Sequence, residues 1–112
     1  MSLRSIFLLV VLGAVLSGCR RVDYRDVTIE VPEMKNAACE EVIRHALRAQ
    51  VAYGVDVEKM VFDLTNRTVR LSYDSVKLSL KNVEFTFAEA GFGANDVPAS
   101  TEARAKLPPA CL

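Results

Sequence analysis

Residues 34–51 read MKNAACEEVIRHALRAQV, a short polar loop followed by one long amphipathic segment. The side chains that recur at three- and four-residue spacing, as on one face of a helix, are Cys39, Val42, Ile43, Ala46, Leu47 and Gln50. Glu40 and Arg44 stand four residues apart in the order that stabilises a helix, and acidic side chains near its start suit the helix dipole. The pattern predicts a helix over residues 37–51, with Cys39 in its first turn.

Strands are predicted on both sides of this helix. Before it, apolar and polar side chains alternate over residues 27–31, and Pro32 closes the run. After it, residues 55–63 and 68–73 are rich in β-branched and aromatic side chains and flank a turn-like triplet at 65–67. These segments predict one strand before the helix and two after it.

A second helix and a last strand complete the pattern. Ser79 is a suitable N-cap, and Gly91 suits the left-handed position that ends a helix. Residues 92–97 predict a short final strand. The order βαββαβ predicts an α+β, ferredoxin-like sandwich, in which a four-stranded antiparallel sheet carries two helices on one face.

The N-terminal residues predict an exported protein. Residues 6–16 form an uncharged apolar block, too short for a bilayer, which needs ~20 residues, and the block follows a single positive side chain, Arg4. It ends in Leu16-Ser17-Gly18-Cys19, which resembles the lipobox of bacterial lipoproteins. The resemblance implies cleavage after residue 18, lipidation of Cys19 and anchoring to a membrane in the cell envelope.

The residue directly after the lipidated Cys19 is Arg20 and not an aspartate. By resemblance to the sorting rules of enteric bacteria, this favours the periplasmic face of the outer membrane.

The tail after the last strand is of a kind that is usually solvated, although Ser100 or Thr101 suits a cap for one or two helical turns. The expected parts are a signal peptide at 1–18, a lipidated tether at 19–25, a domain at 26–97 and a tail at 98–112 that contains Cys111.

Charge and motifs exclude several function classes. The chain has 14 Lys and Arg against 14 Asp and Glu, so its net charge does not indicate a nucleic-acid surface. The acidic residues show neither paired catalytic geometry nor the spacing of a calcium loop, and no nucleophile triad is present, so no enzyme is expected. The single histidine, His45, is expected to be solvated or hydrogen-bonded rather than a metal ligand, and Met34 and Met60 are expected in the core.

Two thiols remain if Cys19 carries lipid, namely Cys39 and Cys111. Two thiols permit one disulfide or one two-coordinate site for a soft metal ion. At the start of a helix, unpaired backbone N–H groups and the helix dipole favour the thiolate form of Cys39. A small buried side chain would explain the same position equally well.

The segment Met34-Lys35-Asn36-Ala37-Ala38-Cys39 resembles the loop Met-x-Cys-x-x-Cys of heavy-metal-associated domains. This family contains copper chaperones, copper-transporting P-type ATPases and periplasmic mercuric-ion-binding proteins. Residues 69–74, 79–80 and 88–92 resemble its third strand, second-helix cap and helix exit, so the resemblance covers about residues 27–97. It implies that Met34 packs beneath the loop and that Cys39 is the second metal ligand, whereas Asn36 stands in place of the first.

An asparagine amide is a hard, weak donor and does not replace a thiolate. Three arrangements stay open: Cys111 supplies the missing sulfur, two molecules share a metal or a disulfide through Cys39, or the domain binds no metal and acts as an envelope protein-interaction module. A structural disulfide between Cys39 and Cys111 is a further possibility and requires Cα atoms within ~7 Å.

The favoured interpretation is a lipid-anchored carrier or scavenger of a soft metal ion. Copper(I) is the ion expected above others, bound by Cys39 with help from Cys111. The resemblance implies transfer to a partner protein by exchange of sulfur ligands. A monomer or weak dimer is expected.

Overall fold

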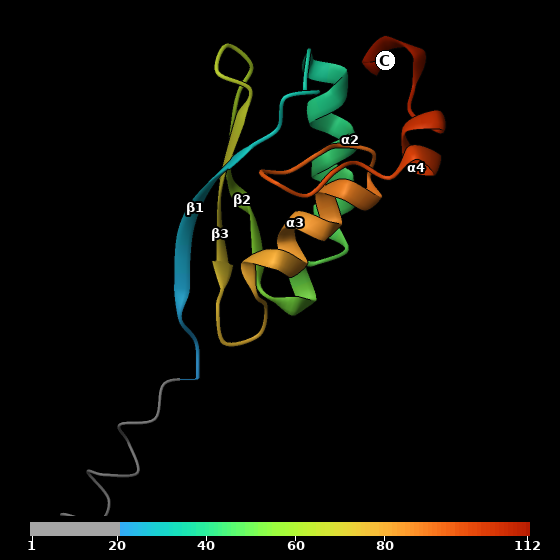
Figure 1. Ribbon diagram of the computed structural model, residues 1–112. Coiled ribbons are helices and arrows are strands. Elements are labelled where there is room, and N and C mark those ends of the chain that lie inside the picture. Colours follow the sequence, from blue (N-terminus) through green and yellow to red (C-terminus); the bar gives the residue numbers. More distant parts are fainter. Residues whose placement is uncertain (1–20) are drawn as a thin grey trace, which may run out of the picture.

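The computed structural model describes residues 21–112 (Figure 1). The predicted signal peptide and Cys19 lie outside the described residues. Among residues 21–112, no helix is both long and apolar enough to cross a membrane. The elements in chain order are β1 (Tyr24–Glu30), α2 (Ala37–Arg48), the 3-10 turn η1 (Val51–Tyr53), β2 (Val55–Asp63), β3 (Thr68–Asp74), α3 (Leu80–Glu89), α4 (Thr101–Ala105) and the 3-10 turn η2 (Pro109–Cys111).

The sheet is antiparallel and has the order β1-β3-β2, so β3 is the central strand. In the ladder, Ile29 lies opposite Val69 and Val27 lies opposite Leu71, which places their apolar side chains on one face. Helices α2 and α3 cover one side of this sheet (Figure 1). The fold is therefore α+β with an antiparallel sheet and two main helices, as the sequence pattern predicts.

The predicted fourth strand at 92–97 is wrong, because the described sheet has three strands. The segment instead turns back on itself, with a single bridge between Ala94 and Val97. Asn95 adopts a left-handed conformation, with φ of 52°, and its side-chain oxygen accepts the Glu30 N–H at 3.0 Å. Its own N–H donates to the Glu30 carbonyl at 2.9 Å. The Asn95 side chain thus satisfies a β1 group that a fourth strand would have paired.

The predicted element boundaries shift at two places. Helix α2 ends at Arg48 rather than at residue 51, and η1 follows it up to Gly54, which has φ of 106°. A Cβ atom at Gly54 would lie 2.7 Å from the Asp74 Cβ, so the close approach to β3 also requires glycine. Strand β1 begins at Tyr24, inside the segment predicted as a tether, because its ladder with β3 extends to the pair Tyr24 and Asp74.

Helix α3 begins and ends where the sequence predicts caps. The Ser79 side chain accepts the Asn82 N–H, and Gly91 has φ of 101° directly after the end of α3. The buried faces of the two helices consist of Cys39, Ile43 and Leu47 in α2 and of Val83, Glu84, Phe87 and Ala88 in α3. Periodicity in the sequence therefore identified most of the core-facing side chains.

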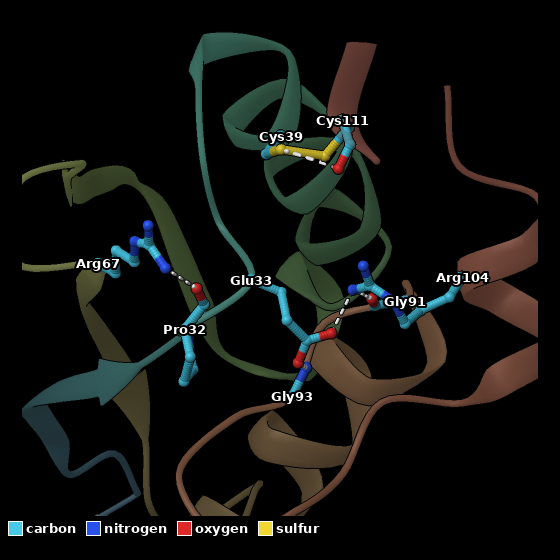
Figure 2. A network of polar contacts seen from close by, with 8 residues as sticks. All are labelled: Pro32, Glu33, Cys39, Arg67, Gly91, Gly93, Arg104 and Cys111. Carbon is cyan, nitrogen blue, oxygen red and sulfur yellow. Dashed lines mark hydrogen bonds and ion pairs between the residues drawn. A yellow bond between two sulfur atoms is a disulfide. The ribbon is translucent and has the colours of Figure 1, made fainter. Parts of the chain in front are cut away.

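The β2–β3 hairpin lies beside the loop that leads into α2. The Arg67 guanidinium donates to the Pro32 carbonyl at 2.8 Å, and the Val31 N–H donates to the Arg67 carbonyl at 2.8 Å (Figure 2). In the same turn, the backbone and side-chain N–H groups of Asn66 bond the Asp63 carboxylate and hold the pKa of Asp63 below its usual value. The hairpin thus fixes the start of the loop that carries the motif.

The expectation of a solvated tail is also wrong. Ser100 caps α4 as predicted, and the following residues pack onto the domain. Leu107 is buried against Gly91, where an added Cβ would lie 3.1 Å from the leucine side chain. Arg104 pairs with Glu33 and donates to the Gly91 carbonyl at 3.0 Å (Figure 2). A leucine and an ion pair therefore hold the tail in place.

Replacing Leu107 by alanine tests this packing. Loss of a buried leucine side chain costs about 2–5 kcal/mol, so Leu107→Ala should lower the free energy of unfolding by about that amount in urea titrations of the oxidised protein. The exposed Leu112 is the matched control, and Leu112→Ala should change stability by less than about 0.5 kcal/mol. Equal effects of the two substitutions would show that the tail does not pack at Leu107.

Candidate metal centre

Cys39 and Cys111 form a disulfide in the structure (Figure 2). Their Cα atoms are 5.2 Å apart although 72 positions separate them in the sequence, and both side chains are fully buried. Cys39 lies in the first turn of α2, and Cys111 is the last residue of η2. The Cys111 carbonyl oxygen lies 3.7 Å from Cys39 Sγ. The tail therefore brings the two sulfurs together at the start of α2.

Asn36 contacts both sulfur-bearing segments. Its side-chain oxygen accepts the N–H groups of Ala38 at 3.0 Å and Cys39 at 3.2 Å, so it is the N-cap of α2. Its amide nitrogen donates to the Ala110 carbonyl at 2.6 Å, one residue before Cys111. The residue that stands in place of the first motif cysteine thus fixes the helix start and holds the tail beside it.

The last residues of the tail approach Cys39 in a restricted conformation. Pro108 and Pro109 precede the second cysteine, and their rings fix the backbone φ angle. The Cys111 N–H donates to the Pro108 carbonyl at 2.9 Å, which closes the short turn. Because Leu107 is buried directly before this turn, few residues separate a packed anchor from the sulfur. The position of Cys111 is therefore defined by the fold as well as by the disulfide.

Both cysteines belong to the buried apolar core of the domain. Met34 is fully buried, which agrees with the place beneath the loop that the family resemblance implies, and Phe92 is also fully buried. His45 is exposed, as expected, and Ala37 is exposed at the helix start. Among the described residues, no cluster of three or more His, Cys, Asp or Glu side chains is placed to hold a metal. A metal ligated here by side chains would depend on the two sulfurs.

In the oxidised state the sulfurs are bonded to each other, and neither is a thiolate ligand. Two electrons and two protons convert the disulfide to two thiols, and loss of the two protons on metal binding gives two thiolates. Linear coordination would place the sulfurs roughly 4.6 Å apart, twice a metal–sulfur bond of about 2.3 Å. Ile43 and Leu47 anchor α2 in the core, so η2 is the segment that would move.

The structure joins the two thiols that the sequence analysis singled out, but the groups that position them were not predicted. Two features were missed: the double role of Asn36 and the ion pair between Glu33 and Arg104. Asparagine directly before an amphipathic helix is a common N-cap, so the first role had a local signal. The ion pair joins residues 71 positions apart and had none. In the oxidised state Cys39 has no free thiol for a second molecule.

Asn36→Asp separates the two roles of Asn36. Aspartate keeps the helix cap but loses the N–H donor to Ala110, so stability should fall by about 0.5–1.5 kcal/mol. Reduction of the buried disulfide by a phosphine should be several-fold faster because the tail is held less firmly.

Asn36→Ala loses the helix cap as well as the donor to Ala110. Loss of the cap should lower the free energy of unfolding by about a further 1 kcal/mol. Asn82→Asp, an exposed change on α3, is the control for added charge and should leave the reduction rate unchanged. An Asn36→Asp variant that is reduced at the parent rate would contradict the proposed tie to Ala110.

No family model matches the sequence, and no curated protein matches it. Among solved structures, the fold is similar to the crystal structure of oxidized MerP from Ralstonia metallidurans CH34, with a TM-score of 0.57 and 25% sequence identity. The match covers 65% of this chain and 96% of the MerP chain, so about a third of the present chain lies outside it. The similarity supports a fold of the heavy-metal-associated type.

Proposed function

We propose that this protein binds a soft heavy-metal ion in the cell envelope and acts as a carrier or scavenger. The ligands are the sulfurs of Cys39 and Cys111. The observation that carries the proposal is that a tail residue meets Cys39 at the helix start, although the nearby loop position holds Asn36. Two sulfurs therefore lie at the loop, one from Cys39 at the start of α2 and one from Cys111 in the tail.

The surroundings of the sulfurs favour a two-coordinate soft ion. Thiolates select soft cations, and the Asn36 amide is already engaged by two backbone N–H groups and one carbonyl. Full burial of both cysteines keeps water from competing for the ion. A d10 cation needs only two such ligands in near-linear geometry, which matches the number of sulfurs.

Metal binding requires the reduced protein. A thiol reductant supplies two electrons and two protons to the disulfide, and the metal ion then displaces two protons as it binds both sulfurs. Release to a partner protein proceeds by exchange of one sulfur ligand at a time. Because Ile43 and Leu47 hold α2 in the core, displacement of η2 would expose Cys39 to an incoming thiolate without unfolding α2.

Two observations support particular ions. The similarity to MerP and the resemblance of the loop to mercuric-ion-binding domains support mercury(II). The resemblance to copper chaperones supports copper(I), which has the same preference for two thiolates. Both ions therefore belong in the test.

The location in the envelope is part of the same proposal. The lipobox at residues 16–19 would place a lipidated Cys19 at the membrane after export. Exported proteins fold in an oxidising space, where disulfides form and persist, and the Cys39–Cys111 bond fits such a compartment. Anchoring would keep a scavenger close to the membrane.

A second candidate function follows from the same disulfide. If the bond is permanent, it closes a loop of 72 positions and stabilises the fold by about 4 kcal/mol in the chain-entropy account. The domain would then be a stapled protein-interaction module in the envelope. This candidate predicts no stoichiometric metal.

Titration of the reduced, lipid-free protein with mercury(II) or copper(I) distinguishes the two functions. One ion per chain should bind, and Cys39→Ser and Cys111→Ser should each weaken binding by about 100-fold or more, because even a lost hydrogen bond to a ligand costs about 10–100-fold. Binding is measured in competition with a chelator of known affinity.

Asn36→Cys combined with Cys111→Ser provides the matched rescue. It moves the second sulfur into the loop and should restore binding that Cys111→Ser alone loses. Equal weak binding by the parent and both serine variants would reject the metal site and favour the stapled module.

A further inference from the structure

We infer that the end of the domain where β1 begins docks on the surface of the lipid bilayer, with the sulfur pair on the opposite side. We call this the entry end and define it as residues 21–25, 48–54 and 74–77. The inference rests on the lipidation of Cys19 in the proposed function, and it adds a membrane-binding surface to the folded domain.

Three separate segments are held together at the entry end. The Asp23 N–H donates to Asp74 Oδ1 at 3.0 Å, and the Ser75 N–H donates to the Asp23 carbonyl at 2.8 Å. The Asp74 N–H donates to the Gly54 carbonyl at 2.8 Å. Figure 1 shows that the chain enters the domain at this end and that η2, with Cys111, lies at the other. The entry end is therefore a defined surface.

Apolar side chains project from all three segments. Those that remain between 52% and 60% exposed are Val22, Tyr24, Val51, Tyr53 and Val76. A hollow of about 400 Å³ adjoins Tyr53, and its lining includes Leu78, just before α3, and the exposed Phe85 on α3. Tyrosine is enriched where proteins meet the bilayer interface, because its ring is apolar and its hydroxyl is polar. The side chains exposed here are of the type that this interface accepts.

The charged residues at this end suit anionic head groups. Arg21, Arg48 and Lys77 are exposed, and Arg25 lies beside Asp23 with N and O atoms 3.1 Å apart. Basic side chains close to a membrane are attracted by the negative surface potential of anionic lipids. Cations around an apolar patch are the combination that binds peripheral proteins to such membranes.

The short chain between Cys19 and β1 identifies the bilayer as the surface that the entry end contacts. Tyr24 lies five positions after Cys19, so the entry end lies within about 17 Å of an acylated Cys19 even if the connection is fully extended. The seven residues of β1 then rise about 23 Å away from that end. A lipid anchor at Cys19 therefore places these apolar side chains at the membrane and directs the sulfurs toward the aqueous space.

Tryptophan fluorescence tests this orientation, because the natural chain contains no tryptophan. The full chain is produced with its export signal, purified in lipidated form and reconstituted into vesicles of phosphatidylcholine and phosphatidylglycerol with brominated acyl chains. Tyr53→Trp should lose about half of its emission, since interfacial side chains reach about 5–10 Å into the bilayer boundary. Leu64→Trp, in the hairpin at the opposite end, should keep its emission.

A pair of valines provides the matched control. Val76→Ser should reduce the quenching of the Tyr53→Trp probe, whereas Val61→Ser, at an equally exposed valine on β2, should leave it unchanged. Protein that floats with the vesicles but shows equal quenching of both probes would overturn docking while leaving the lipid anchor intact. Protein that does not float would overturn the anchor and docking together. Metal titration of the lipid-free protein is independent of both results.

Discussion

The structure depends on the meeting of Cys39 and Cys111 at the start of α2. This contact joins the end of the tail to the loop between β1 and α2 and closes a loop of 72 positions. Asn36 supports the contact from both sides, as the N-cap of α2 and as donor to Ala110. The buried Leu107 and the ion pair of Arg104 with Glu33 hold the tail before it reaches the sulfur. The same contacts define both the fold of the tail and the candidate site.

The arrangement explains how a chain with Asn36 in its loop can still present two sulfurs. In the loop pattern that Met34 to Cys39 resemble, both ligands come from one short segment. Here the second sulfur comes from a distant segment, and Asn36 takes over the positioning of both. Because η2 follows the last anchor, this sulfur can move while Ile43 and Leu47 keep α2 in place. Opening and closing of the site would then depend on the redox state and on the tail.

Local patterns in the sequence predicted most of the fold. Periodicity identified both main helices, and capping residues marked the ends of α3. Alternation and the content of β-branched and aromatic side chains identified three strands, because these signals depend on neighbouring residues. The predicted fourth strand failed because the Asn95 side chain satisfies Glu30, which is a long-range contact. The packed tail was missed for the same reason, since Leu107 and Arg104 meet partners that are distant in sequence. The two thiols were identified by elimination, but their geometry needed the structure.

X-ray absorption at the metal edge of the reduced protein, loaded with one equivalent of mercury(II), shows directly whether both sulfurs bind one ion. We expect two sulfur neighbours at about 2.3 Å in a species that remains monomeric, and one sulfur neighbour after Cys111→Ser. A spectrum with nitrogen or oxygen neighbours only, or two sulfurs found only in a dimer, would contradict a site formed by positions 39 and 111 of one chain.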